Sequence, residues 1–274
     1  MNILFFCAKD SLRVARLAVG YYTHIGFPVN VTIYTPSENN KILNSLNLPN
    51  CLVANDESIP GYEEIVKFLN SKRGEILEKK RRTVGWYLQQ YLKVAAAFHS
   101  SEPIFISDGD TIFSGNLLGD ISRSPKLLTT KEDPDTYNNG CRVLGYSTFP
   151  VSFVANGGLF CPRELRLRIP CCTKWFQNSL ETILDDSNGS SDFSEYQIMG
   201  NILSSKLNTR RLRIFRRFDM LSKLEDLDSV SDVYLSKLER IFNRYDALAW
   251  EFGHKSDPVK RLVARLAFLC NYSW

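Results

Sequence analysis

The chain is poor in the residues that build zinc sites and disulfide frameworks. Among 274 residues there are only 3 histidines, and the 7 cysteines show neither C-x-x-C pairs nor an even, dense spacing. These cysteines are Cys7, Cys51, Cys141, Cys161, Cys171, Cys172 and Cys270. Such spacing argues against a cysteine-rich zinc module and against a small disulfide-bonded fold, so we expect reduced thiols.

Long apolar runs and low-complexity linkers are also missing. The N-terminus, MNILFFCAKD, has no basic residues ahead of its apolar run, which stops at Cys7 or Ala8. This run is too short for a signal peptide or a membrane span. We therefore expect a cytoplasmic protein, which can also sit at the inner face of the cytoplasmic membrane.

The composition is that of a globular protein. Hydrophobic residues make up 44% and charged residues 23%, and the net charge is 34 − 30 = +4. This excess suits phosphate-bearing ligands or an anionic membrane but demands neither. Basic residues cluster from Lys72 to Arg82 and from Arg210 to Arg217, without the interleaved aromatics of single-strand binders. We expect no nucleic-acid partner and one domain over residues 1–274.

The opening of the chain predicts a βαβ unit. An apolar run from Ile3 to Ala8 precedes Lys9-Asp10-Ser11, which can cap a helix over residues 11–25. The β-branched residues of 29–35 then predict a second, parallel strand. Openings of this kind are typical of nucleotide-binding domains.

The middle of the chain predicts a mixed sheet flanked by helices. A helix over 84–98 places apolar residues on one stripe and leads to the strand IFIS, which ends in Asp108-Gly109-Asp110. The stripe consists of Val84, Leu88, Tyr91, Leu92, Ala95 and Phe98. Further strands are expected at 126–130 and 157–162, an ordered loop at 131–150, and mainly helices from Arg163 onward.

The Asp-Gly-Asp triplet predicts a cation site. The carboxyl ends of parallel strands are where α/β sheets bind ligands, and Gly109 permits close backbone approach. Hard cations such as Mg²⁺ and Mn²⁺ prefer carboxylate oxygens and bridge to diphosphates. A solvated or turn-capping pair is the alternative, but two apolar runs flank the triplet, where unpaired charges are expensive. We expect Asp110 to bind the metal and Asp108 to contact the metal or a ribose.

These segments resemble the GT-A glycosyltransferases, and within them a bacterial branch of surface-polysaccharide (lipopolysaccharide or capsule) assembly. The similar segments are GWYLQQYLKVAAA, IFISDGDTIF, FVANGGLFCPREL and DFSEYQIMGN. The resemblance implies a Rossmann-type mixed sheet, with a nucleotide-sugar half at 1–130 and an acceptor half at 131–256. It also implies Mn²⁺- or Mg²⁺-dependent transfer of a sugar from a UDP-sugar to a glycan or lipid-linked acceptor.

Individual residues follow from that resemblance. Glu195 is the candidate base or acceptor contact, with a helix N-terminal carboxylate as the alternative. Donor contacts are expected from Ala8, Lys9, Asp10, Gln89, Gln90, Lys93, Asp108, Gly109 and Asp110, and acceptor contacts from Asn156, Gly157, Gly158, Glu195 and Tyr196. Helix capping is the alternative for Asp10, solvent exposure for the α-helical Gln and Lys residues, and a bulge or turn for the glycines.

The end of the chain carries two more expectations. His254 is a candidate third metal ligand, or else an ordinary imidazole, and His24 and His99 are read as structural. Residues 257–270 form a basic amphipathic helix within the C-terminal segment 257–274, which either docks on a membrane or packs on the core.

Two other functions fit less well. A nucleotidyltransferase also uses acidic pairs, but no G-x-G-x-x-G or G-x-x-x-x-G-K phosphate loop is present. A catalytically inactive carbohydrate- or partner-binding module of the same fold is the non-enzymatic alternative, because a fold does not guarantee activity.

Overall fold

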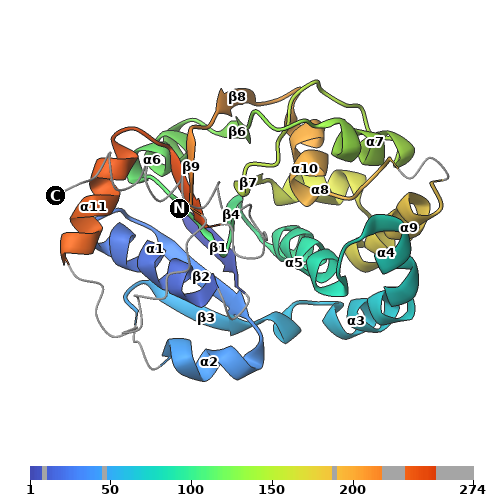
Figure 1. Cartoon of the computed structure of the whole chain (residues 1–274), viewed down its shortest axis with the longest axis horizontal. Helices are drawn as coiled ribbons and strands as arrows, with labels where there is room; N and C mark the ends of the chain where they lie inside the picture. The colour runs from blue at the N-terminus through green and yellow to red at the C-terminus, as the bar shows by residue number, and fades with distance from the viewer. Residues whose placement is uncertain (8–10, 45–47, 187–189, 218–231, 251–274) are drawn as a thin grey trace, which may run out of the picture.

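A central five-stranded sheet organises the protein, in the order β3-β2-β1-β4-β7 (Figure 1). The computed structural model describes residues 1–7, 11–44, 48–186, 190–217 and 232–250. The strands are β1 (Asn2–Phe6), β2 (Asn30–Thr35), β3 (Cys51–Asn55), β4 (Ile104–Asp108) and β7 (Gly157–Phe160). The first four run parallel and β7 runs antiparallel to β4. The mixed α/β sheet predicted from the sequence is confirmed.

The predicted βαβ opening is also confirmed. Helix α1 (Leu12–His24) connects β1 to β2, which pair in parallel with Ile3 opposite Val31. Alternate residues of the two strands face α1 and are buried, for example Phe5 and Ile33 at 0% exposure. Strand β3 was not predicted, because its residues are only half-buried or exposed at the sheet edge and give a weak apolar pattern.

The opposite face of the sheet is covered by α5 (Val84–His99). Of the predicted stripe, Tyr91, Leu92 and Ala95 are buried, and the other three members are partly buried against the same core. The helix is buried on more than one face because further helices pack around it. These are α3 (Tyr62–Ser71), α8 (Pro162–Arg168) and α9 (Cys172–Leu184), with α4 (Arg73–Lys80) packed on α9.

One prediction about the second half of the chain was wrong. The expected loop at 131–150 contains α7 (Asp135–Val143), whose polar sequence buries only a few side chains and so gives a weak helical pattern. The described chain from Arg163 onward is mainly helical, as predicted, and includes α10 (Glu195–Leu203) and α11 (Asp232–Phe242). It also contains three strands that were not predicted: β8 (Asn208–Arg211), β9 (Ile214–Arg217) and β10 (Ala247–Trp250).

These late strands return to the middle of the molecule. β10 pairs antiparallel with β5 (Thr111–Phe113) and parallel with β9, and β8 pairs with β6 (Lys126–Thr129). β8 and β9 are rich in arginine and lack apolar alternation, so the sequence pattern did not reveal them, and β10 is an apolar run of only four residues. Their pairing brings the end of the described chain beside the strand that follows Asp110.

The remaining elements lie at the edges. They are α2 (Ser37–Asn44), the short 3₁₀ helix η2 (Asp56–Ser58) and α6 (Gly115–Arg123). The six cysteines within the described ranges are free thiols, as expected. No helix in the described part of the chain combines the length and apolar character needed to cross a membrane.

Candidate active site

The Asp-Gly-Asp triplet lies where β4 ends. The Asp108 backbone N–H donates to the Asn156 carbonyl over 2.8 Å, and the Asp110 carbonyl accepts from the Trp250 N–H over 2.9 Å. These bonds fix both sides of the turn to β7 and β10. The sheet therefore holds two carboxylates at its carboxyl edge, where the sequence placed them.

Gly109 is required by the end of β1. A Cβ on this residue would lie 2.5 Å from the Phe6 carbonyl oxygen and 2.7 Å from the Ser11 hydroxyl oxygen. Neither distance is compatible with a real side chain. The close approach that glycine permits here is to the neighbouring strand, which brings the chain after β1 against the triplet.

Lys93 of α5 bridges two carboxylates. Its ammonium donates to Asp108 Oδ1 and, over 2.6 Å, to Glu195 Oε1. The Lys93 side chain is 2% exposed and that of Glu195 is 1% exposed. Burial opposes the charge on Lys93, but Asp108 and Glu195 outweigh it and raise the pKa of Lys93, so the amine stays protonated.

Tyr196 completes the cluster from α10. Its hydroxyl donates to Asp108 Oδ1 over 2.8 Å, and its ring lies 4.6 Å from the Lys93 ammonium. Burial, with the charge of Asp108 second, holds the pKa of Tyr196 well above its usual range. The phenol therefore remains a hydrogen-bond donor, and both known donors to Asp108 use the same oxygen, Oδ1.

Glu195 is held from several sides and still has one oxygen unsatisfied. Its backbone N–H donates to Gln90 Oε1 over 3.2 Å, and its Oε2 is buried without a hydrogen-bond partner. Burial raises the pKa of Glu195, against the opposing effect of Lys93. A buried carboxylate oxygen without a donor is costly, so a hydroxyl group that reached Oε2 would stabilise it.

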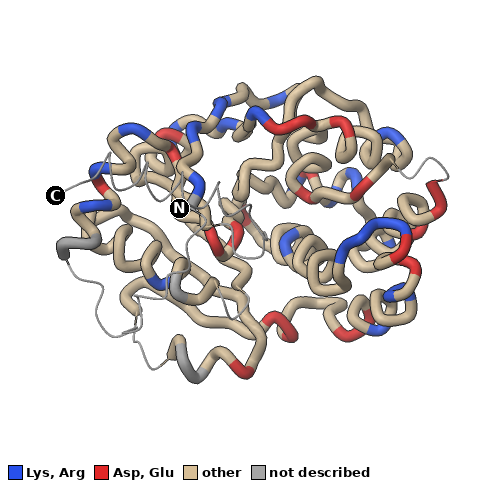
Figure 2. The backbone as a smooth tube through the Cα atoms, viewed as in Figure 1, with Lys and Arg blue, Asp and Glu red and all other residues tan. Residues whose placement is uncertain are grey.

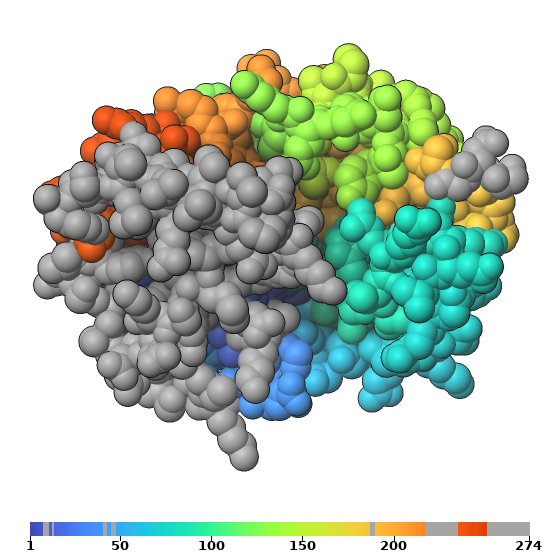
Figure 3. Space-filling model, in the orientation of Figure 1, coloured from blue at the N-terminus to red at the C-terminus, as the bar shows by residue number. Residues whose placement is uncertain are grey.

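The start of α10 is set by residues that sequence reasoning missed. Ser194 caps the helix by accepting from the Gln197 N–H, and Asp192 accepts from the Tyr87 hydroxyl over 2.7 Å and from Arg82 Nε over 3.2 Å. The S-x-x-Q spacing of residues 194–197 was the available clue, because it matches a helix-capping motif. Arg82 also donates to the Tyr137 hydroxyl. This hydrogen bond connects the segment after α4 with α7, which are coloured cyan and green in Figure 3.

The carboxylate of Asp110 is hydrogen-bonded to its neighbour Thr111 and, through it, connected to Asn156. Asp110 Oδ1 accepts from the Thr111 hydroxyl over 3.1 Å, and that hydroxyl accepts from Asn156 Nδ2 over 3.3 Å. Asn156 has a left-handed backbone with φ of 55°. Asn156, which was predicted to contact the acceptor, is thus connected to Asp110 through the Thr111 hydroxyl.

The two glycines after Asn156 differ in their surroundings. A Cβ on Gly157 would lie 2.6 Å from the Phe113 ring, so packing inside the protein explains this glycine. A Cβ on Gly158 would lie at an ordinary 3.5 Å from the Tyr196 ring. Of the two glycines, only Gly158 has a side chain of the predicted site, that of Tyr196, as its nearest neighbour.

The predicted donor residues of α5 point inward. Gln90 is 5% exposed and Lys93 is 1% exposed, so solvent exposure does not describe them. Gln89 Nε2 donates to the Phe6 carbonyl over 3.2 Å, at the end of β1. The remaining predicted positions, Ala8, Lys9, Asp10 and His254, lie outside the described residues, as does the segment 257–270.

The chemistry of the cluster suits a hard divalent cation in part. Two carboxylates, those of Asp108 and Glu195, share the ammonium group of Lys93, and Asp110 lies on the other side of Gly109. Oxygen donors on both sides of Gly109 are the type that Mg²⁺ and Mn²⁺ prefer. Within the described ranges, however, no three His, Cys, Asp or Glu side chains converge as a complete ligand set.

Comparison with known proteins supports the fold. No protein-family profile and no curated protein matches the chain. The crystal structure of the galactosyltransferase LgtC in complex with donor and acceptor sugar analogs matches 100% of this chain and 97% of its own, with a TM-score of 0.56 at 11% identity. An active-site mutant of LgtC matches 97% of this chain and 95% of its own, with a TM-score of 0.50 at 12% identity. The chain therefore has a GT-A-like glycosyltransferase fold.

Proposed function

We propose that this chain is a metal-dependent glycosyltransferase that moves a sugar from a nucleotide diphosphate donor, in particular a UDP-sugar, to an acceptor hydroxyl. The observation that carries the proposal is the convergence of Lys93, Glu195 and Tyr196 on Asp108 beside Asp110. A fold like that of LgtC, whose structure holds donor and acceptor sugar analogs, supports this interpretation. A glycan or lipid-linked acceptor in bacterial surface-polysaccharide synthesis belongs to the same proposal.

Asp110 and the second oxygen of Asp108 would hold Mn²⁺ or Mg²⁺. The ion would supply charge neutralisation for the departing diphosphate. His254 is proposed as a third ligand. The role of the protein is to keep Asp108 in one orientation, because Lys93 and Tyr196 both bind its Oδ1 and leave Oδ2 directed elsewhere.

The reaction breaks the bond between the sugar anomeric carbon and the diphosphate oxygen and forms a bond from that carbon to the acceptor oxygen. The acceptor hydroxyl proton passes to the departing diphosphate, whose oxygen gains negative charge as its bond to the sugar breaks. Glu195 was predicted as the base or as a contact to the acceptor hydroxyl. Its burial and its ion pair with Lys93 favour a positioning role instead, in which Glu195 fixes Lys93 and its Oε2 binds a sugar hydroxyl.

The two roles of Glu195 predict different kinetics. If Glu195 is a positioning residue, Glu195→Gln keeps the shape of the pH profile, because the amide oxygen still accepts a hydrogen bond. The same substitution raises KM for the donor. If Glu195 is the base, the same change removes the pH dependence of kcat on its acidic side. A pH series of kcat and KM for Glu195→Gln and Glu195→Asp decides between them.

The assay for the function itself measures UDP release. The purified protein is incubated with a panel of UDP-sugars and acceptor sugars, with Mn²⁺, with Mg²⁺ or with EDTA. We expect acceptor-stimulated UDP release that needs the metal and is lost in Asp110→Asn, while Asp185→Asn, at an exposed aspartate, leaves it unchanged. Absence of metal-dependent UDP binding by calorimetry would favour an inactive binding module. Pyrophosphate release from a nucleoside triphosphate would favour a nucleotidyltransferase.

Peripheral membrane contact is part of the proposal for a lipid-linked acceptor. Figure 2 shows Lys and Arg residues along β8, β9 and α11. Arg211 of β8 is exposed, and the side chain of Arg213, between β8 and β9, is 65% exposed. Basic surfaces of this kind attract anionic lipids. Sedimentation with phosphatidylglycerol vesicles should carry the protein down at low salt, and phosphatidylcholine vesicles should not.

A further inference from the structure

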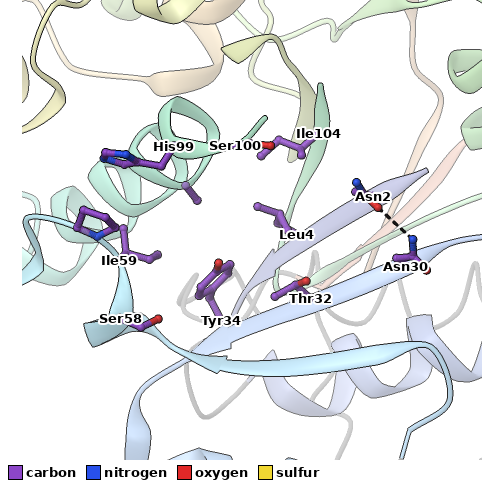
Figure 4. A pocket seen from close by; sticks show the side chains of 12 residues that line it. Asn2, Leu4, Asn30, Thr32, Tyr34, Ser58, Ile59, His99, Ser100 and Ile104 are labelled. Atoms are coloured by element: carbon purple, nitrogen blue, oxygen red, sulfur yellow. Dashed lines mark hydrogen bonds between the residues drawn. The ribbon is translucent and has the colours of Figure 1, made fainter. Parts of the chain in front are cut away.

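A groove lies on the face of the same parallel strands that α5 covers. It starts where β1, β2 and β4 begin and runs along β2 to Tyr34, and its wall includes the end of α5 and the loop after η2 (Figure 4). Its volume of about 400 Å³ is in the range of small-molecule pockets. Leu4 and Tyr34 of neighbouring strands point into it from the sheet, and Ile59 faces them.

The lining of the groove carries no formal charge. None of the described residues that line it is Lys, Arg, Asp or Glu, although these make up 23% of the chain. A phosphate or carboxylate ligand would lose its hydration there without gaining a counter-charge, which is unfavourable. The groove therefore suits a neutral ligand.

Two carboxamides stand at its mouth. Asn30 Nδ2 donates to Asn2 Oδ1 over 3.2 Å, and Figure 4 shows this bond between the starts of β1 and β2. The bond uses one donor and one acceptor, and Asn2 Nδ2 and Asn30 Oδ1 make no side-chain hydrogen bond to another described residue. One amide donor and one amide acceptor side by side match a pair of neighbouring hydroxyls, each of which donates and accepts.

The floor of the groove is apolar and fixed. The Tyr34 ring stacks on Phe6, with 5.3 Å between centroids and 11° between planes. Leu4, Ile59 and Ile104 add aliphatic surface beside it. His99 and Ser100 supply further polar groups at the end of α5. An apolar floor with a polar, uncharged rim complements a sugar ring, which has an apolar face of C–H groups and a rim of hydroxyls.

We propose that this groove is a second carbohydrate-binding site that takes a neutral sugar unit. It is separate from the Asp108 corner, because Phe6 of β1 lies between Tyr34 and Asp108 in the strand register, and Ile104, the lining residue of β4, is four strand residues, roughly 13 Å, from Asp108. Binding here does not depend on catalysis. The inference therefore goes beyond the proposed transfer reaction and fails or holds independently of it.

The direct test is NMR on the full chain without donor or metal. Maltose, lactose and cellobiose are the neutral probes, and glucuronate and glucose 6-phosphate are the charged ones. We expect saturation transfer to the neutral disaccharides at millimolar concentration, with shifts of the Tyr34 and His99 resonances on titration. The charged sugars should give neither effect. No transfer to any neutral disaccharide, or shifts confined to resonances of the Asp108 corner, would overturn the proposal.

Two variants sharpen the test. Thr32→Lys places a charge in the groove, and Asn30→Ala removes a carboxamide from its rim; we expect each to weaken disaccharide binding at least tenfold. Thr209→Lys is the matched control, an exposed threonine on β8 outside the groove, and should bind like the wild type. Asp110→Asn should also bind normally. Binding that survives both groove variants would show that the sugar sits elsewhere, and UDP release by these variants reports on the transfer reaction separately.

Discussion

The two ends of β1 and β4 differ in charge. At their carboxyl ends, Asp108, Lys93 and Glu195 form a buried ionic cluster, with Asp110 beside it. The groove that starts at their amino ends and runs along β2 from Asn30 to Tyr34 is lined by uncharged side chains alone, as far as the described residues show. Both lie on one rigid sheet, so the contrast arises from the side chains and not from the backbone.

The two ends differ in charge because their polar groups are stabilised in different ways. At the carboxyl end every charge is near an opposite charge or a hydrogen-bond donor, apart from Glu195 Oε2, because burial makes unpaired ions costly. At the amino end solvent reaches the rim, and nothing requires charge. Charge therefore marks the end where a charged substrate and a leaving group would be handled.

The largest effect is expected from Asp110→Asn. Loss of this carboxylate should lower kcat by roughly 10²–10³-fold, as removal of one electrostatic stabiliser does in other enzymes. Disaccharide binding at the groove should stay unchanged. UDP release and NMR on the same protein sample measure the two effects, and equal loss of both would contradict the separation of the two ends.

Lys93→Met should be the most destabilising substitution. It leaves Asp108 and Glu195 buried without their shared cation, and breaking a buried ion pair costs about 3–5 kcal/mol. Adding Glu195→Gln should recover part of that loss. Denaturant unfolding gives the free energies. Lys79→Met is the control, because Lys79 is 43% exposed in its pair with Glu75 and solvent-exposed pairs contribute far less than buried ones. Similar losses in Lys93→Met and Lys79→Met would show that the cluster is not buried as described.

Gly109→Ala should have an intermediate effect. The new Cβ meets the Phe6 carbonyl, a backbone atom that cannot easily move, and overpacking of this kind costs about 1–3 kcal/mol. The shift also displaces both aspartates, so kcat should fall. Gly74→Ala is the control, since nothing lies within 4 Å of its Cβ position in α4 and alanine favours a helix. A fully active, fully stable Gly109→Ala would contradict the described approach of β1.

Asp56→Asn should give the smallest effect, visible only in its pH dependence. Asp56 follows β3, and burial followed by the charge of Glu57 raises its pKa to about 7. A raised carboxyl pKa favours the protonated folded state, so its stabilisation is complete below about pH 4 and is lost as pH rises through 7. Asp56→Asn should therefore be more stable than wild type at pH 8 and equal to it at pH 4. A gain that persists at pH 4 would argue against this cause.

Local patterns predicted much of the fold. The βαβ opening, the helix before the triplet and β4 were all found, because their apolar residues repeat with the period of their own element. The failures share a cause. α7 has few apolar positions, and β8 and β9 are rich in arginine, so their structure depends on partners far away in the chain.

The candidate site divides in the same way. Asp108 and Asp110 stand out in the sequence because a charged triplet follows an apolar strand, and Lys93, Glu195 and Tyr196 entered through family resemblance. Nothing local indicated that Lys93 bridges Asp108 and Glu195, residues 15 and 102 positions away. The support from Asp192 and Tyr87, 105 positions apart, was missed for the same reason.

The sequence alone determined that a buried strand ends in two aspartates within an α/β protein, because alternation and burial are properties of consecutive residues. Only the tertiary structure decided which cation faces those aspartates, which oxygen is left unsatisfied and where the uncharged groove opens. The physical reason is that charge pairing and cavity shape depend on distances in space, and those are set when α5, α10 and the sheet pack together.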